Sequence, residues 1–557
     1  MRLNRLSNAQ TGQRLSLVPK EPESSNHNSL ASPAIEAIST WLVFQLAKRL
    51  ELATEQIDIH KDFADYGLSS LEAVNLSGDL ENWLGRRLSP TLLLDFDNIN
   101  ALAQHLAQET TSDNSSHSHE QLPSLATKNQ DLLPRLNRLS SPEGNGNTVP
   151  TKEIPEEYYR LELTPEYRQL KLKQGEINTL GIDNPFFRPQ AGVVGDTTVI
   201  NNQELINFAT YNYLGMCGDP AISQAAQAAI DKYGTSACAS RLISGEKPLH
   251  RELEQAIAQL IGTEDSIVYV GGHATNVTTI GHLFGQNDLI LYDSLSHNSI
   301  VQGCFLSGAT PVSFPHNDWE ALDKLLHERR HLYRKVLIAI EGVYSTDGDI
   351  PDLNKFIELK KRHKTFLLID EAHSIGVLGK NGGGIGELFA VNPADVDLWM
   401  GTLSKSFASC GGYIASSKTI VEYLKYTAPG FVYSVGISPP NAAATLAAIE
   451  VLKAEPQRVA RLHERAELFL RLAKEQGIDT GISKGSSVIP VIVGDSLKSV
   501  QLSQNLFRRG INVPFMFYPS VPKDAARLRF FITCTHTPEQ IRYTVDTLAQ
   551  ELAKLEQ

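Results

Sequence analysis

The segment FLLIDEAHSIG, residues 366–376, decides the fold class of this 557-residue chain. Its first four residues are apolar, and Asp370 ends the run. A short buried strand that stops at a polar residue is typical of a parallel α/β sheet, where ligands bind beyond the carboxyl ends of the strands. Three more apolar runs alternate with amphipathic helical segments: SIVYV (266–270), LILY (289–292) and VLIAI (336–340). The pattern predicts one large α/β domain whose parallel strands are covered by helices on both faces.

The N-terminal part of the chain has a different composition. Residues 1–31 are rich in Asn, Ser, Gln and Arg without apolar periodicity, which predicts a disordered leader. Ser32 and Pro33 then favour a helix start, and apolar residues follow at spacings of three or four: Ile35, Ile38, Leu42, Leu46 and Leu50. Further helical patterns after Gly67 and at 98–106 predict a small all-α bundle over residues 32–109. Residues 110–152 are typical of a flexible linker, which leaves 153–557 for the α/β domain.

Composition excludes several classes of protein. The formal net charge of −12 argues against a nucleic-acid binder, because such a protein needs a basic surface for phosphates. The cysteines are odd in number and lack a CxxC pair, so neither a disulfide framework nor a metal site is expected: Cys217, Cys238, Cys304, Cys410 and Cys534. No stretch approaches the ~20 apolar residues of a membrane span, and the N-terminus lacks the apolar core of a signal peptide. We expect a cytoplasmic protein.

A serine in the helical bundle is the first candidate for chemistry. In DYGLSSLEAVNL (65–76), Ser70 follows a glycine turn and starts a helix. Taken alone, it is best interpreted as a helix N-cap. In context, the segment resembles the phosphopantetheine-attachment loop of acyl carrier proteins, and LGRRLSPTLLLDFDNINALAQHL (84–106) resembles their later helices. The resemblance implies a carrier four-helix bundle with 4'-phosphopantetheine on Ser70, although Ser69 replaces the family's usual aspartate.

The segment TLSKSFASCGGY (402–413) places Lys405 among small residues. An exposed lysine beside a loop is the ordinary alternative. However, Thr402, Ser404 and Ser406 are suited to a phosphate, and a desolvated lysine becomes a Schiff-base nucleophile. Asp370 and His373 strengthen the second interpretation, because pyridoxal phosphate requires a carboxylate at its ring nitrogen.

Three more segments follow strands. VYVGGHATN (268–276) offers Gly271, Gly272 and His273 to a phosphate at a helix start. LYDSLSHNSI (291–300) contains His297, and EGVYSTDGDIP (341–351) contains Ser345. Each segment alone has a structural interpretation. Five such segments that suit one cofactor together indicate a pyridoxal-phosphate site.

Over roughly 158–552, the chain closely resembles the α-oxoamine synthases, a fold-type I, aminotransferase class I/II-like family of pyridoxal-phosphate enzymes. The family includes serine palmitoyltransferase and 8-amino-7-oxononanoate synthase. Besides the segments quoted above, four others occur in family order: ATYNYLGM (209–216), GTSACASRLISGEKPLHRELE (234–254), FVYSVGISPP (431–440) and RLRFFITCTHTPEQI (527–541).

The resemblance implies a role for each candidate residue. It implies that Lys405 forms the Schiff base and moves the proton, that His297 stacks on the cofactor ring, and that Asp370 pairs with the ring nitrogen. It further implies that His373 and Ser345 flank the ring hydroxyl, and that Gly272, His273, Thr402 and Ser404 hold the phosphate. Ser434 is expected to reach the cofactor of a partner subunit in a homodimer. The candidates for substrate binding are Tyr211, Asn212, Ser520 and Arg529.

One loop departs from the family pattern. Phe517 replaces an arginine of the family's loop, and Ser520 replaces its threonine, whereas Arg529 is retained. Carboxylate binding by Arg529 is therefore expected, without a second, mobile arginine.

The implied reaction joins glycine, alanine or serine to an acyl thioester, with loss of carbon dioxide, to give an α-amino ketone. The acyl group is expected on the chain's own carrier domain, which requires a phosphopantetheinyl transferase and an acyl-loading enzyme as partners. Three alternatives stay open: a synthase that uses acyl-CoA, an aminotransferase, and an inactive carrier scaffold. The retention of Lys405, Asp370, His297 and His373 argues against the last.

Overall fold

The computed structural model describes residues 31–49, 52–66, 76–77, 79–80, 84, 92–94, 96, 98–112, 154–179, 184–517, 520–522 and 524–555. The chain divides into two compact units, Met1–Asn145 and Gly146–Gln557. The predicted leader, most of the predicted linker and Ser70 lie outside the described residues. Each unit is described by itself.

The first unit is helical where it is described. Helices α1 (Ala31–Arg49) and α3 (Ile99–Ser112) pack against each other and bury the apolar faces that the sequence predicts: Ile38, Leu42, Leu46, Ile99, Leu102 and Leu106. Helix α1 begins at Ala31, so Ser32 lies within its first turn and does not cap it. The cap of α3 is Asn98, whose Oδ1 accepts a hydrogen bond from the Ala101 N–H. The helix predicted after Gly67 falls largely outside the described residues.

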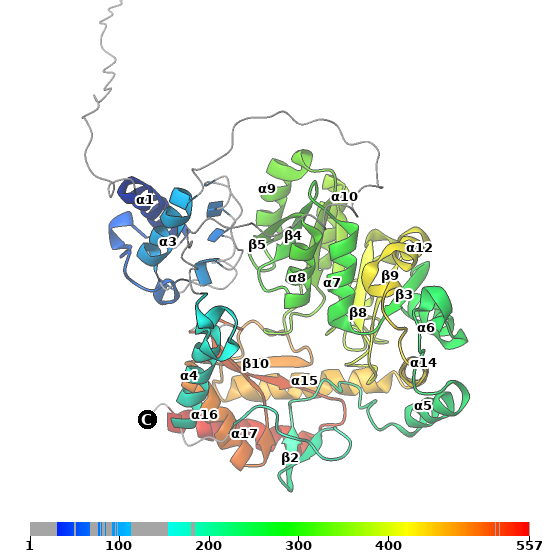
Figure 1. Ribbon diagram of the computed structural model, residues 1–557. Helices are drawn as coiled ribbons and strands as arrows, with labels where there is room; N and C mark the ends of the chain where they lie inside the picture. Colours follow the sequence, from blue (N-terminus) through cyan, green and yellow to red (C-terminus); the bar gives the residue numbers. More distant parts are fainter. Residues whose placement is uncertain are drawn as a thin grey trace, which may run out of the picture. The chain divides into compact units, whose positions relative to one another are not determined.

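The second unit is built on a seven-stranded sheet of order β3-β9-β8-β7-β6-β4-β5 (Figure 1). The strands are β3 (Asp265–Tyr269), β4 (Leu289–Asp293), β5 (Thr310–Phe314), β6 (Val336–Glu341), β7 (Phe366–Asp370), β8 (Leu398–Thr402) and β9 (Gly412–Ser416). The four quoted apolar runs form β3, β4, β6 and β7. The sheet is mixed, because β9 runs antiparallel to both of its neighbours. Residues 403–411 are too few for the crossover of about a dozen residues that a parallel β9 would need.

The strand register brings polar side chains together at one edge of the sheet. Glu341 at the end of β6 pairs with Asp370 at the end of β7, and Asp370 pairs in turn with Met400 of β8. Parallel neighbours end at the same edge, so residues that are distant in sequence become adjacent there. Among the helices that pack around the sheet are α6 (Pro248–Ile261), α7 (Gly272–Leu283), α10 (Leu353–His363) and α12 (Lys418–Thr427).

A smaller lobe of the same unit closes the site. Its antiparallel sheet has the order β10-β13-β12, with β10 (Val488–Gly494), β12 (Phe515–Met516) and β13 (Ala526–Phe531). Helices α15 (Gln457–Glu475), α16 (Ser496–Arg508) and α17 (Pro538–Leu555) contact one another or this sheet (Figure 1). Strands β1 (Thr197–Ile200), β2 (Gln203–Asn207) and β11 (Ile511–Asn512) form a third sheet. Strand β13 supplies Arg529.

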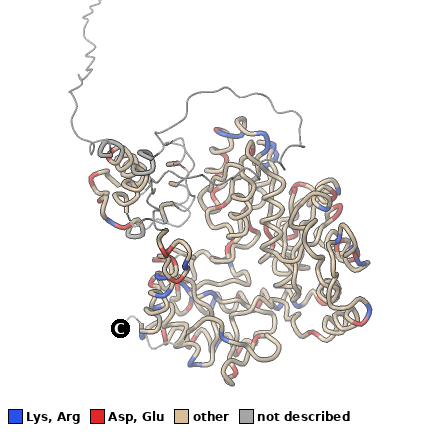
Figure 2. The backbone as a smooth tube through the Cα atoms, in the orientation of Figure 1, with Lys and Arg blue, Asp and Glu red and all other residues tan. Residues whose placement is uncertain are grey.

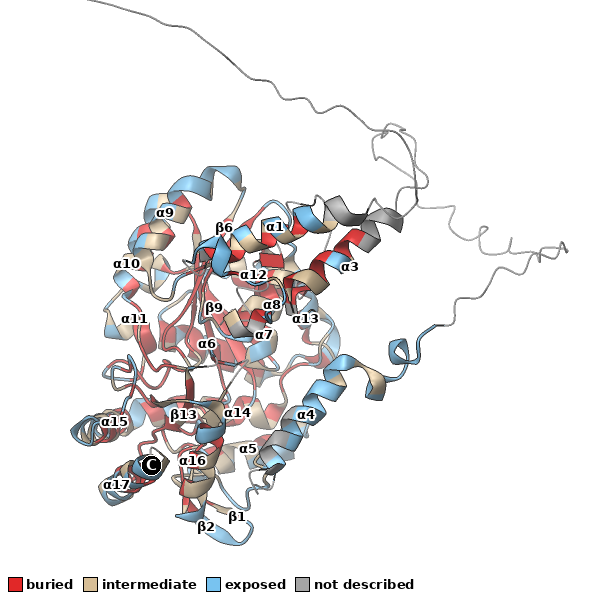
Figure 3. Cartoon of the chain, turned by 90° about the vertical axis from the view of Figure 1, so that its left-hand side faces the viewer, coloured by how far each residue is buried: buried red, intermediate tan, exposed pale blue. Residues whose placement is uncertain are grey.

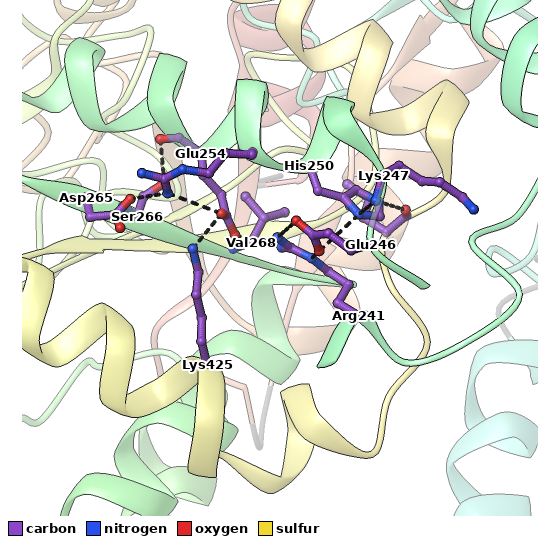
Figure 4. A network of polar contacts seen from close by, with 11 residues as sticks. Arg241, Glu246, Lys247, His250, Glu254, Asp265, Ser266, Val268 and Lys425 are labelled. Carbon is purple, nitrogen blue, oxygen red and sulfur yellow. Dashed lines mark hydrogen bonds and ion pairs between the residues drawn. The ribbon is translucent and has the colours of Figure 1, made fainter. Parts of the chain in front are cut away.

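Basic and acidic residues are interspersed along the described backbone (Figure 2). One of the buried charged residues is Glu254 of α6, whose side chain is fully buried (Figure 4). Arg241 Nη1 and Lys425 Nζ each lie 2.6 Å from this carboxylate. A buried carboxylate requires such partners, because its desolvation costs several kcal/mol. The network therefore ties the π-helical turn Arg241–Gly245 to α6 and α12.

Candidate active site

A cavity of about 270 Å³ lies at the carboxyl edge of the large sheet. Its lining includes eleven of the residues that the sequence analysis proposed: Tyr211, Gly272, His273, His297, Ser345, Asp370, His373, Thr402, Ser404, Lys405 and Arg529. They come from segments that start at residue 211 and end at residue 529. Ser299, Glu341, Ala372 and Met400 complete the lining and were not predicted.

Lys405 lies in the connection between β8 and β9, in surroundings that favour the neutral amine. Burial lowers the pKa of Lys405 from 10.5 to about 8, although Asp370 and Glu341 oppose the shift. Its Nζ lies 5.5 Å from the centre of the Tyr211 ring. A lysine with this pKa is a competent nucleophile and base near neutral pH.

Asp370 is held in place by two hydrogen bonds. Its Oδ2 accepts from Asn276 Nδ2 at 2.7 Å, and its Oδ1 accepts from the Ala372 N–H at 2.9 Å. The sequence analysis missed Asn276, which lies one turn into α7 and is fully buried. Donors on both oxygens fix the orientation of the carboxyl group that would pair with a protonated ring nitrogen.

Glu341 is a second carboxyl group at this edge. Burial and the neighbouring Asp370 raise the pKa of Glu341 well above its usual range, so this side chain favours the neutral acid. Its Oε1 accepts the His297 N–H at 2.5 Å. The available signal was the position of Glu341 directly after VLIAI, as the first residue of the quoted segment EGVYSTDGDIP.

His297 caps α8 (Asn298–Ser307) with its own ring. Nδ1 accepts the Ser299 N–H at 3.2 Å and lies 2.7 Å from the Ser299 hydroxyl. Burial lowers the pKa of His297, and the nearby Lys405 and His273 lower it further. A neutral imidazole whose Nδ1 accepts carries its proton on Nε2. His297 therefore offers an N–H donor.

His373 follows β7 and is buried. Burial lowers the pKa of His373 well below its usual range, and Lys405 and Arg529 act in the same direction. Its Nδ1 lies 2.7 Å from the hydroxyl of Tyr213, a fully buried residue that was not predicted. Tyr213 is in the quoted segment ATYNYLGM, but its neighbour Tyr211 was proposed instead.

One end of the cavity suits a phosphate. Gly272 and His273 begin α7, where the first N–H groups of a helix lack intrahelical acceptors. The hydroxyl oxygens of Thr402 and Ser404 lie 2.9 Å apart beside them. A Cβ on Gly272 would lie 2.8 Å from Thr402 Oγ1, so only glycine allows this approach. The donors match an anion held by backbone and hydroxyl groups.

Arg529 of β13 also lines the cavity. Its Nη1 donates to the Ser345 carbonyl at 2.9 Å, and its guanidinium lies 4.6 Å from the Phe531 ring. Its buried Nε has no hydrogen-bond partner. A guanidinium with an unused donor is suited to a carboxylate.

The structure places three proposed residues elsewhere. The side chain of Asn212 hydrogen-bonds to backbone groups: its Nδ2 donates to the Val194 carbonyl, and its Oδ1 accepts from the Cys217 N–H. Ser434 lines a separate cavity of about 10 Å³ beside Arg241. Ser520 is exposed and does not line the site cavity. The proposed roles of Asn212, Ser434 and Ser520 stay predictions.

Phe517, which replaces the family's loop arginine, packs on Val500 and stacks on Phe515. Phe515 pairs with Leu528, so it lies on the face of the small sheet opposite Arg529. The substituted side chain thus anchors the loop through apolar contacts.

Comparison with known proteins identifies the family. The model of aminotransferases of class I and II matches residues 203–548, and that of the phosphopantetheine attachment site matches 40–106. The 8-amino-7-oxononanoate synthase of Fervidobacterium nodosum is 37% identical, covering 69% of this chain and 95% of its own length. The chain belongs to the α-oxoamine synthases.

Other α-oxoamine synthase relatives agree with this assignment. Long chain base biosynthesis protein 2a of Oryza sativa subsp. japonica is 36% identical, covering 63% of this chain and 75% of that protein. The structure of Sphingomonas wittichii serine palmitoyltransferase is similar with a TM-score of 0.68 and 30% identity, covering 71% of this chain and 99% of that one. This α-oxoamine synthase is a pyridoxal-phosphate-dependent acyltransferase with a fold-type I domain and an N-terminal carrier domain.

The described side chains of this synthase fit pyridoxal phosphate. Lys405 presents a partly neutral amine, Asp370 a carboxylate for the ring nitrogen, and the start of α7 with Thr402 and Ser404 a phosphate site. When bound, the cofactor supplies a ring that stores the electrons of the substrate α-carbon. No described helix combines the length and low polarity that a membrane crossing needs.

Proposed function

We propose that this synthase condenses a small L-amino acid, namely glycine, alanine or serine, with an acyl group carried on Ser70 of its own carrier domain. The observation that carries this proposal is the presence of a phosphopantetheine attachment domain and a complete catalytic cavity in one chain. The products are an α-amino ketone, carbon dioxide and the free carrier thiol. The domain boundaries 32–109, 110–152 and 153–557, and the cytoplasmic location, are parts of this proposal.

Lys405 acts as the base at the substrate α-carbon. Its pKa of about 8 leaves roughly a tenth of the amine neutral at pH 7, enough to accept a proton, and the resulting ammonium returns it later. Hydrogen bonds from Asn276 and the Ala372 N–H hold the Asp370 carboxyl group in place, so it is preorganised for the positive ring nitrogen.

Arg529 orients the amino acid. Its guanidinium lines the cavity and suits the substrate carboxylate, while Tyr211 flanks Lys405. The cavity of about 270 Å³ also receives the cofactor.

His297 assists attack on the thioester. Its Nε2–H can donate to the carbonyl oxygen, where negative charge develops during the carbon–carbon bond formation. The low pKa of His297 keeps the imidazole neutral, so this group polarises the carbonyl without adding a charge beside Lys405.

The fused carrier raises the local concentration of acyl thioester. A flexible connection of about 40 residues has an r.m.s. span of roughly 35 Å, comparable to the diameter of a domain. The effective concentration is then on the order of millimolar. The phosphopantetheinyl transferase and the acyl-loading enzyme are separate partners.

The synthase is proposed to act as a homodimer. Several large apolar side chains around Ser434 are exposed in the single chain: Leu242, Ile243, Tyr433 and Val435. Exposed apolar patches on this scale mark protein interfaces. Helix α4 (Pro165–Thr179) is likewise exposed along most of its length (Figure 3).

The deciding experiment compares acyl-Ser70 with acyl-CoA. The carrier is loaded by a phosphopantetheinyl transferase, and release of carbon dioxide and product mass are measured with glycine, alanine and serine. We expect turnover from the loaded wild type and none from Ser70→Ala without added acyl-CoA, whereas Ser69→Ala should load and turn over. Equal rates for Ser70→Ala and the wild type with acyl-CoA would favour a synthase that does not need its carrier. Transfer of nitrogen without carbon dioxide release would indicate an aminotransferase.

A further inference from the structure

His316 connects two loops that supply residues to the catalytic cavity, although it does not itself line the cavity. It follows β5 in the segment FPHND (314–318). One loop leads from Asp293 at the end of β4 to His297. The other leads from Glu341 at the end of β6 through Ser345 to Asp349.

Both ring nitrogens of His316 face carboxylates. Nδ1 lies 2.8 Å from Asp293 Oδ1, and Nε2 lies 2.9 Å from Asp349 Oδ2. The side chains of both aspartates are almost fully buried, with exposures of 0% and 3%. Ionised carboxylates only accept hydrogen bonds, so two such contacts require two N–H donors on one ring. The geometry therefore describes an imidazolium.

Each aspartate organises its own loop, Asp293 through its carboxylate and Asp349 through its backbone carbonyl. Asp293 also accepts the N–H groups of Leu295 and Asn317, at 2.8 and 2.7 Å, which shapes the turn before His297. The backbone carbonyl of Asp349 accepts a hydrogen bond from the Tyr344 N–H at 3.1 Å, which closes its loop. Ser345 lies inside the turn thus closed.

We infer that His316 is a positioning residue that joins the loop of His297 to the loop of Ser345 through a doubly hydrogen-bonded imidazolium. Without it, two buried carboxylates repel each other, and the loops stay linked by Asn317 and by the hydrogen bond from the His297 N–H to Glu341. The repulsion shifts the two loops relative to each other. His297 and the Ser345 carbonyl, which accepts a hydrogen bond from Arg529, then lose their relative placement. Misplacement by about 1 Å costs on the order of a hundredfold in rate.

The electrostatics of the cluster agree with this geometry. Burial by itself lowers the pKa of His316, but hydrogen bonds to Asp293 and Asp349 outweigh it and raise the pKa to about 10. The remaining titratable neighbour is Tyr344, whose ring lies edge-on to the imidazole at 4.5 Å. Burial raises the pKa of Tyr344 well above its usual range, so Tyr344 stays neutral while His316 is charged.

The test compares His316→Gln, the double variant His316→Gln/Asp349→Asn, and His331→Gln as a control at an exposed histidine. The readouts are the dissociation constant of pyridoxal phosphate from the apoprotein, kcat and KM of the holoenzyme, and the folded fraction by circular dichroism. We expect His316→Gln to weaken cofactor binding about tenfold and to lower kcat about 10- to 100-fold per folded molecule. The double variant removes one of the two repelling charges. Its cofactor affinity and its kcat should each be at least about fivefold higher than those of His316→Gln. His331→Gln should match the wild type.

Unchanged cofactor affinity and kcat in folded His316→Gln would overturn the inference, as would a double variant no better than the single one. If His316→Gln does not fold, the pH dependence of apoprotein unfolding tests the role of His316 instead. Since the folded-state pKa is raised, the stabilisation is complete below about pH 6.5 and is lost as pH rises through about 10. The wild type should therefore lose more urea resistance between pH 7 and 10 than the double variant, and equal losses would refute the role. The kinetic readout rests on the proposed function, which fails separately if the wild type shows no turnover.

Discussion

The hydroxyl of Tyr213 lies 2.7 Å from Nδ1 of His373, and both side chains are buried. Because the pKa of His373 is well below its usual range, the imidazole is neutral. Its Nδ1 then accepts a hydrogen bond from the hydroxyl of Tyr213. The remaining ring proton is then on Nε2. Tyr213 thereby determines which nitrogen of His373 acts as a donor, which matters for the predicted contact with the cofactor ring hydroxyl.

Tyr213→Phe should therefore lower kcat about 5- to 10-fold, the equivalent of one lost hydrogen bond of about 1 kcal/mol. The shape of the side chain is kept, so the protein should fold normally. Steady-state kinetics measure the effect. Tyr292→Phe is the control, because Tyr292 is as deeply buried but does not line the cavity. Equal kcat values for the two variants would show that the contact with His373 is not used.

The start of α7 allows a sharp test of the phosphate site. Gly272→Ala should raise the dissociation constant of pyridoxal phosphate at least about tenfold, because the new Cβ would lie 2.8 Å from Thr402 Oγ1 and displace it. Titration of the apoprotein with the cofactor measures this constant.

Gly271→Ala provides the matched control, since a Cβ there meets nothing within 4 Å and the backbone is extended, with φ of −169°. The phosphate would have to lie elsewhere if both alanine variants bound the cofactor equally well.

Two adjacent acidic residues should differ strongly. Asp370→Asn should lower kcat about 100-fold or more, because the positive ring nitrogen loses its buried partner. Glu371→Gln should have little effect: Glu371 accepts the Ile385 N–H at 2.7 Å outside the cavity. Burial raises the pKa of Glu371 to about 8, so glutamine resembles its neutral form. Comparable losses in the two variants would contradict the assignment of Asp370.

Covalent trapping should follow the titration of Lys405. Since burial lowers its pKa to about 8, the neutral amine increases about tenfold per pH unit below that value and then levels off. Incorporation of pyridoxal phosphate after borohydride reduction should show this profile at Lys405, measured by peptide mass spectrometry. Labelling of the exposed Lys418 in the same digest serves as the reference for the general reactivity of the reagents towards lysine. Lys405→Ala should remove the labelled peptide. An extent of labelling that does not change between pH 7 and pH 8 would contradict a pKa of about 8 for Lys405.

The fold class was predictable because buried strands have a strong local signature. The four quoted apolar runs become β3, β4, β6 and β7, and the polar residues at their ends point to the site. The direction of β9 was not predicted, since pairing depends on the length of the connection from β8 and on neighbours far away in sequence.

The cavity residues were predictable for a related reason. Eleven of them occur in motifs that one cofactor and its substrate explain, and most lie at or just after the end of a strand. Asn276, Glu341 and Tyr213 were missed because each hydrogen-bonds to another residue of the site, and a motif does not show which of its residues makes such a contact. Asn212 lies within a motif, yet its amide hydrogen-bonds to backbone groups.

The amino-acid sequence by itself determined the α/β class, the family and the lysine, carboxylate and histidines of the site, because residue type and local spacing encode strand ends and cofactor chemistry. Only the tertiary structure decided which groups hold those residues in place and in which protonation state. Burial and contacts between distant segments set both, as in the lowered pKa of Lys405 and the bridge of His316 between Asp293 and Asp349.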